Sequence, residues 1–138
     1  VTGVQTCALP ISGTVSTANA LRSGAGGAPG VGCLAIQLQP GSRSQAELVA
    51  DVEDGVLIQM VQGLHSGVNP VSGDFSAGAS GLQITNGTLG APLREFTIAS
   101  TLQRMLLEIV EVGGDIDWLP SRASGMSLVI RDVTVSGA

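Results

Sequence analysis

Hydrophobic positions along this chain follow two periods, one of two residues and one of three to four. Residues 33–39 (CLAIQLQ) place Leu34, Ile36 and Leu38 at every second position, which is typical of a strand buried on one face. A Pro-Gly pair then ends this predicted strand. Residues 56–61 (VLIQMV) are almost continuously apolar and predict a second strand.

The clearest turn signal lies in residues 81–89 (GLQITNGTL), which contain an Asn-Gly pair between two strand-like segments. An Asn-Gly pair tolerates the positive φ angles of a type I′ turn, so a β-hairpin is predicted there. A further strand is predicted over residues 92–98 (PLREFTI). Its apolar spacing breaks strict alternation, which indicates a bulge near Arg94 and Glu95.

Two stretches carry the signals of a helix start. Residues 44–47 (SQAE) have the S-x-x-E spacing of a capping box, which predicts a short helix over residues 45–53. Residues 100–103 (STLQ) have the related S-x-x-Q spacing and predict a second helix over residues 101–112. Apolar residues recur there at three- and four-residue spacing until a Gly-Gly pair, namely Leu102, Met105, Leu106, Ile109 and Val110.

The last predicted element is a strand, because residues 127–135 (SLVIRDVTV) are rich in β-branched side chains. The order is therefore strand, helix, several strands, helix, strand. Such an order indicates an α+β fold that consists mainly of antiparallel β-sheet, barrel-like or curved, with two helices.

The first eleven residues (VTGVQTCALPI) match the translation of a common sequencing-library adapter, so residues 1–11 are set aside as an artefact. An adapter joined to an open reading frame marks the end of a DNA fragment. We therefore expect the natural protein to continue upstream and this chain to be a truncated C-terminal piece. Residues 12–32, rich in Gly, Ser and Ala, are predicted to be a loop or linker, and residues 33–138 one domain.

Composition narrows the classes of function. With 43% hydrophobic and 12% charged residues the chain is globular rather than disordered, and no apolar run approaches the roughly 18 residues of a membrane helix. We expect no membrane contact. The net charge is −5 and the six basic residues, all arginine, form no cluster, so direct nucleic-acid binding is not expected. Beyond the adapter Cys33 is the only cysteine, which favours a reducing compartment.

The only histidine opens a polar motif at residues 65–76 (HSGVNPVSGDFS). His65 is a candidate metal ligand or general base. The chain has no HExxH or HExxxH motif and no second histidine, so a hydrogen-bonded structural histidine is the favoured interpretation. Ser72 and Asp74 are candidates for a nucleophile and an orienting acid, although an Asx or serine turn is the commoner use of such residues.

The remaining candidates are weaker. Asp115 and Asp117 lie two positions apart and offer oxygen ligands to a hard cation, but a solvated loop is the default for so short a pattern. Cys33 lies in a strand pattern, where it acts more often as a small apolar filler than as a reactive thiol. The residues alone therefore assign no catalytic and no metal-binding position.

Two long segments resemble the C-terminal domain of the TldD/PmbA family. They are residues 63–87 (GLHSGVNPVSGDFSAGASGLQITNG) and 91–119 (APLREFTIASTLQRMLLEIVEVGGDIDWL), and the resemblance extends over residues 12–138. It implies membership of a family whose two types pair in a cytoplasmic, zinc-dependent peptidase complex. That complex acts in proteolysis of peptides or unfolded proteins, and its members also bear the name modulator of DNA gyrase.

The two types differ in their metal ligands. One carries an HExxxH motif upstream and a cysteine ligand in the loop between the last helix and the last strand, and the PmbA type, also called TldE, lacks both. The matching loop here, residues 115–126 (DIDWLPSRASGM), contains no cysteine. The resemblance therefore implies a non-catalytic PmbA/TldE-like subunit without a cofactor of its own. Its expected partner is an HExxxH-bearing TldD-like subunit that holds the zinc.

Within this interpretation the motif at residues 65–76 is expected to shape a peptide channel or a subunit contact. The residues concerned are His65, Asn69, Ser72, Asp74 and Phe75. A peptide substrate would bind by adding a strand to an exposed sheet edge. Two alternatives stay open: the C-terminal piece of a catalytic TldD-like metallopeptidase, and a pure protein-interaction module.

Overall fold

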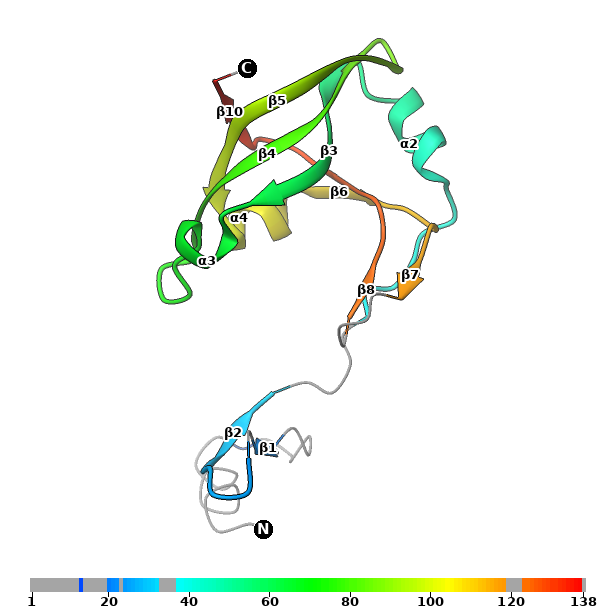
Figure 1. Ribbon diagram of the computed structural model, residues 1–138. Coiled ribbons are helices and arrows are strands. Elements are labelled where there is room, and N and C mark those ends of the chain that lie inside the picture. Colours follow the sequence, from blue (N-terminus) through cyan, green and yellow to red (C-terminus); the bar gives the residue numbers. More distant parts are fainter. Residues whose placement is uncertain (1–12, 14–19, 23, 33–36, 119–122, 138) are drawn as a thin grey trace. The chain divides into compact units, whose positions relative to one another are not determined.

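The computed structural model describes residues 13, 20–22, 24–32, 37–118 and 123–137. The chain forms two compact units, Val1–Ile36 and Gln37–Ala138 (Figure 1). In the first unit, β1 (Ala20–Arg22) pairs antiparallel with β2 (Pro29–Val31). A short two-stranded sheet thus lies within the segment for which a loop or linker was predicted.

The second unit is built on a four-stranded antiparallel sheet. Its strands, in the order β10-β5-β4-β3, are β3 (Asp54–Gln62), β4 (Asp74–Thr85), β5 (Thr88–Thr101) and β10 (Thr134–Ser136). The two long strands β4 and β5 curve along their length, and within the described residues the sheet stays open at β3 and β10 (Figure 1). The prediction of an α+β fold with a mainly antiparallel, curved sheet is confirmed, and the sheet does not close into a barrel.

The predicted hairpin joins β4 to β5. Asn86 and Gly87 have φ angles of 48° and 72°, which are the positive values that a type I′ turn requires. The turn is also held from outside, because the amides of Asn86 and Gly87 donate to the carbonyls of Glu53 and Val52 at 2.6 and 2.9 Å. A Cβ on Gly87 would overlap the carbonyl of Ala50, so glycine is needed for this close approach as well as for its φ.

The predicted bulge is present in β5. Ala79 pairs with Phe96 and Gly81 with Leu93, so two steps along β4 correspond to three steps along β5. Glu95, in the extra stretch, has a φ of 58°. Such a bulge bends the strand and redirects the side chains beside it.

The described residues contain three short helices, one more than predicted. In α2 (Gln45–Ala50) both halves of the predicted capping box form between Ser44 and Glu47. The helix ends at its C-cap Asp51 rather than at residue 53, because β3 begins at Asp54. The additional helix is α3 (Leu64–Gly67), a single turn directly after β3.

The second predicted helix is only half as long as expected. The structure has α4 (Leu102–Leu107), capped by Thr101 rather than Ser100, followed by β6 (Ile109–Val112) in place of the predicted last turn. Two of the four residues of β6 are valine and one is isoleucine, which suits a strand, and β6 pairs with β9 (Leu128–Ile130). The prediction of helix over residues 108–112 is therefore wrong, since a tertiary partner outweighs the helical spacing.

The last predicted strand is divided in two. Asp132, with a φ of 55°, separates β9 from β10, and the two strands belong to different sheets. A further pair, β7 (Asp117–Trp118) and β8 (Ser124–Gly125), lies between β6 and β9 in the sequence. Of the strand predicted over residues 33–39, residues 33–36 lie outside the described residues, and residues 37–39 are irregular.

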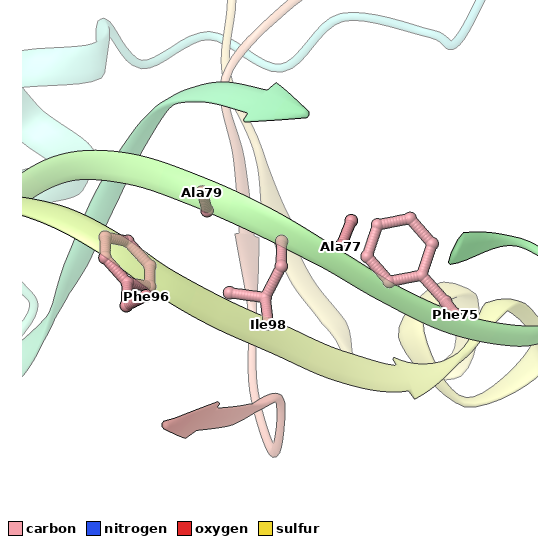
Figure 2. Packing of buried hydrophobic residues seen from close by; sticks show 5 residues of the cluster. All are labelled: Phe75, Ala77, Ala79, Phe96 and Ile98. Atoms are coloured by element: carbon pink, nitrogen blue, oxygen red, sulfur yellow. The ribbon is translucent and has the colours of Figure 1, made fainter. Parts of the chain in front are cut away.

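The hydrophobic core lies on one face of β4 and β5. Phe75, Ala77 and Ala79 alternate along β4 and lie beside Phe96 and Ile98 of β5 (Figure 2). Phe96 is the most enclosed side chain among the described residues, with 1% of its surface exposed. The alternation leaves the intervening residues of these strands on the other face.

Among the described residues, no helix has the length and apolar character needed to cross a membrane.

Candidate functional site

The motif at residues 65–76 forms a corner, which we define as residues 63–76, at one end of the four-stranded sheet. Gly63, with a φ of 77°, turns the chain from β3 into α3. Val68 then forms an isolated antiparallel bridge with Phe75, which returns the chain to the sheet. Gly67 lies so close to the carbonyl of Ser76 that a Cβ would overlap it, so a larger residue there would push α3 off the sheet.

A side-chain-capped turn forms the tip of the corner. The side-chain Oδ1 of Asn69 accepts hydrogen bonds from the amides of Val71 and Ser72 at 2.9 and 3.3 Å. The amide of Asn69 donates to the carbonyl of Asp74 at 2.9 Å, and its carbonyl accepts from Gly73 at 2.8 Å. This is the Asx-turn chemistry expected of Asn in such a sequence.

Ser72 and Asp74 are in direct contact, and both lie at the surface. The hydroxyl of Ser72 donates to Oδ2 of Asp74 at 2.6 Å, while the amide of Asp74 donates to the Ser72 hydroxyl at 3.3 Å. The Nε2 of Gln103, in α4, donates to the carbonyl of Ser72 at 3.3 Å. The pair thus stabilises the turn, and a carboxylate that accepts from a serine hydroxyl does not by itself activate that serine as a nucleophile.

The five candidate residues are not gathered into one site. Asn69, Ser72 and Asp74 share the hydrogen bonds of the turn, whereas His65 takes no part in them and exposes its side chain on α3. Phe75 belongs to the hydrophobic core and lies beside Ala77 (Figure 2). Sequence reasoning missed Gln103, which was assigned to a capping box, and no local signal links it to a turn 31 residues away.

A groove of about 380 Å³ lies over β3, β4 and β5 and is lined by residues 62, 78–80 and 94–97, which include the core residues Ala79 and Phe96. Gln62, Gly78 and Thr97 form one row across β3, β4 and β5, and Arg94 and Glu95 of the bulge lie beside it. The row presents an amide and a hydroxyl over a glycine, flanked by charges of both signs. These groups can donate to and accept from a peptide backbone.

The edge of the sheet next to this groove is free among the described residues. β3 pairs with β4 on one side only, and it is the outermost strand in the sheet order. Gln59 has no partner in the β3–β4 register, which shifts at this point. Such an edge carries main-chain donors and acceptors with which an extended peptide can pair.

A second polar cluster lies away from the corner and holds α2 against β6. Arg43 forms ion pairs with Glu111 at 3.0 Å and Asp51 at 2.6 Å, and it donates to the carbonyl of Glu47 at 2.6 Å. Hydrogen bonds to Asp51 and Glu111 raise the pKa of the Arg43 guanidinium, which is always charged in any case. The backbone and side-chain hydrogen bonds from Ser44 lower the pKa of the Glu47 carboxyl. Every group is occupied in the fold, so this cluster has a structural role.

The two aspartates weighed as cation ligands have different surroundings. Asp115 accepts from the hydroxyl of Ser127 at 2.6 Å and from its amide at 3.1 Å. The hydroxyl bond is the main reason why the pKa of the Asp115 carboxyl is lowered. Asp117 lies in β7 and is exposed. Asp115 thus has a structural role, because it holds Ser127 by two hydrogen bonds.

Zinc sites in proteins use three or four His, Cys, Asp or Glu side chains. The residues that the structure describes contain no group of three or more such side chains in reach of one metal ion. Both cysteines, Cys7 and Cys33, lie outside the described residues. The described part of the chain therefore does not fit a zinc ion on its own.

Residues 10–137 match the family model described as the PmbA/TldA metallopeptidase C-terminal domain. The chain belongs to this family. The match covers both the four-stranded sheet and the corner, and it confirms the resemblance on which the sequence interpretation rested.

Proteins named PmbA are similar to this chain over about two thirds of its length. Over 90 residues, or 65% of this chain, it is 38% identical to the "Metalloprotease PmbA homolog" of Haemophilus influenzae. Over 91 residues, or 66% of the chain, it is 31% identical to "Metalloprotease PmbA" of Escherichia coli O157:H7. The aligned parts are only 19% and 20% of those two proteins, so this chain spans about a fifth of the length of its PmbA relatives.

Solved structures of the family share the fold. A protein from Thermotoga maritima described as a modulator of a DNA gyrase has a TM-score of 0.79 and 29% identity, over 93% of this chain and 28% of that one. TldE from Thermococcus kodakarensis has a TM-score of 0.78 and 26% identity, over 94% of this chain and 29% of that one. The PmbA/TldA C-terminal domain described here is thus similar to domains that occur in chains several times longer.

Proposed function

We propose that this chain is the C-terminal domain of a PmbA/TldE-like subunit of a cytoplasmic zinc metallopeptidase complex, and that this subunit is non-catalytic. One observation carries the proposal. The loop at residues 115–126, where the family resemblance places a cysteine ligand in the catalytic type, contains no cysteine. The absence of a three-ligand group among the described residues and the similarity to a TldE structure support it.

In this proposal the zinc and the HExxxH motif belong to a TldD-like partner subunit, and the substrates are peptides or unfolded proteins. The domain contributes a surface rather than a reacting group. The free edge of β3 and the groove beside it hold an extended peptide through main-chain hydrogen bonds, which tolerate many sequences. The corner at the end of the same sheet lies against the peptide or the partner subunit.

The test is to produce the full PmbA-like polypeptide with and without an HExxxH-bearing subunit, and to measure zinc content and peptide hydrolysis for each protein and for the mixture. We expect zinc only in the HExxxH subunit and hydrolysis only in the mixture. One zinc per PmbA-like subunit on its own would make it a catalytic member instead. Full activity of the HExxxH subunit alone would reduce this domain to an interaction module.

A further inference from the structure

Met60 is the most exposed of the three methionines. It exposes 55% of its surface on β3, whereas Met105 packs against the core cluster and Met126 is half-buried. A thioether is oxidised only when the oxidant can reach its sulfur, so Met60 is the most susceptible of the three. The chain thus carries one accessible thioether on the edge strand of its main sheet.

The sulfur of Met60 contacts a residue of the groove. The Nε2 of Gln62 donates to the Sδ of Met60 at 3.4 Å. Val61, between them, packs against the core cluster, so Met60 and Gln62 share the other face of β3. Gln62 lines the groove, and Met60 lies opposite Ser80, another lining residue, in the β3–β4 register. The thioether therefore lies next to the groove and holds the side-chain amide of one of its polar residues.

Oxidation changes the hydrogen-bonding capacity of this sulfur. A peroxide transfers one oxygen atom to the thioether: a lone pair of the sulfur forms the S–O bond, the O–O bond breaks, and hydrogen peroxide is reduced to water. A thioether is a weak hydrogen-bond acceptor, whereas the sulfoxide is polar and its oxygen accepts strongly. The sulfoxide of Met60 would thus compete for the side-chain donor of Gln62 that the groove otherwise offers to a peptide.

We propose that Met60 is a site of reversible oxidation by peroxides, and that its sulfoxide weakens peptide binding at the groove by holding the side-chain amide of Gln62. The effect on peptide binding rests on the proposed function, whereas the preferred oxidation of Met60 and the new contact of Gln62 do not. Methionine sulfoxide reductases restore the thioether while a dithiol is oxidised to a disulfide and water is released, so the change can be reversed.

The first measurement is independent of peptidase activity. The full PmbA-like polypeptide is treated with dilute hydrogen peroxide, and the oxidation of each methionine is followed by mass spectrometry of its peptides. We expect Met60 to be oxidised roughly five times faster than Met105, or more. The side-chain amide signals of Gln62 in ¹⁵N NMR spectra should shift on oxidation. Met60→Leu, which keeps an apolar side chain without sulfur, should show no shift on the same treatment.

The second measurement reads peptide processing. Only the PmbA-like subunit is treated, and the peroxide is removed before the untreated HExxxH subunit is added. We expect KM to rise roughly fivefold, the equivalent of one lost hydrogen bond, with kcat unchanged. Sulfoxide reductase with a dithiol should restore KM, and treated Met60→Leu should keep the KM of the untreated protein. Met60→Gln, which places a permanent polar acceptor there, should raise KM without peroxide.

Three results would overturn the proposal. Oxidation of Met60 no faster than that of Met105 would show that its sulfur is covered in the whole polypeptide. Unshifted signals of Gln62 in the oxidised protein would show that the sulfoxide does not hold this amide. An unchanged KM, or a rise that Met60→Leu shares, would remove the effect on peptide binding. Hydrolysis by the untreated complex is measured first, so its absence marks failure of the proposed function, and the first measurement still decides the oxidation of Met60.

Discussion

The carbonyl of Gly73 accepts a hydrogen bond from the amide of Leu102 at 2.8 Å, which ties the corner to the first residue of α4. Gly73 has a φ of 82°, and the side chain of Gln103 fills the space where a Cβ would lie. We therefore expect Gly73→Ala to lower the free energy of unfolding by about 1–3 kcal/mol, measured by urea denaturation.

The double variant Gly73→Ala/Gln103→Ala separates the two causes of this loss. It relieves the overlap with the side chain but keeps the unfavourable φ. Gly73→Ala should therefore destabilise the Gln103→Ala protein less than it destabilises the wild type. If Gly73→Ala proves as stable as the wild type, the corner does not have the backbone described here.

The core of the sheet depends on Phe96, which is 1% exposed and lies beside Ala79 on the facing strand. Phe96→Ala should cost about 3–5 kcal/mol in the free energy of unfolding, because it removes buried apolar surface and leaves a cavity. The matched control is Leu89→Ala, since Leu89 is 45% exposed and its truncation should cost far less. Equal losses in the two variants would contradict the placement of the core on this face.

The hydrogen bonds from Ser127 to the Asp115 carboxylate predict that the stability of the domain depends on pH. The pKa of the Asp115 carboxyl is lowered in the fold, first by the Ser127 hydroxyl, so the folded state favours the ionised form. This contribution to stability is fully present above the unfolded pKa of about 3.9, and it is lost as the pH falls through the lower folded value.

Ser127→Ala should therefore raise the folded pKa of Asp115 toward its ordinary value, as followed by carboxyl ¹³C chemical shifts. Its destabilisation should be larger at neutral pH than in acid, where the Asp115 carboxyl is protonated in both proteins. Ser136→Ala, at an exposed position of β10, is the control and should leave the titration unchanged. An unchanged Asp115 titration in Ser127→Ala would rule out the hydroxyl as the cause.

His65 is exposed on α3 and stands apart from the hydrogen-bonded turn. If zinc is held by the partner subunit, His65→Ala should leave the zinc content of the complex unchanged, as measured by elemental analysis of the purified complex. Asn69→Ala is a useful comparison, because it removes a turn acceptor and should lower stability without changing zinc content. Loss of zinc in His65→Ala alone would contradict the non-catalytic assignment.

The free edge of β3 offers a test of peptide binding. Gln59 lies where the β3–β4 register shifts and has no partner in that register, so Gln59→Pro changes the edge at the position least engaged in the sheet. We expect weaker peptide processing by the complex, seen as a higher KM, with the zinc of the partner subunit unchanged. Gln59→Ala keeps the backbone amide and should behave as the wild type. If the proline variant folds and processes peptides normally, the peptide does not bind at this part of the edge.

The sequence alone determined the features that depend on neighbouring residues. Asn86 and Gly87 produce the hairpin because their backbones accept positive φ, Ser44 and Glu47 cap α2 across three residues, and uneven apolar spacing locates the bulge at Glu95. Asn69 also forms the turn that its residue type favours. Each outcome follows from contacts within a few residues, so no distant partner was needed to predict it.

Only the tertiary structure decided where α4 ends and how the corner is held. Residues 109–112 have a helical spacing, but pairing with β9 near the end of the chain makes them a strand. Gln103 reaches back 31 residues to Ser72, and Asp132 breaks the last strand so that its halves join different sheets. These results depend on which segments meet in space, and hydrophobic spacing within one segment carries no information about its partners.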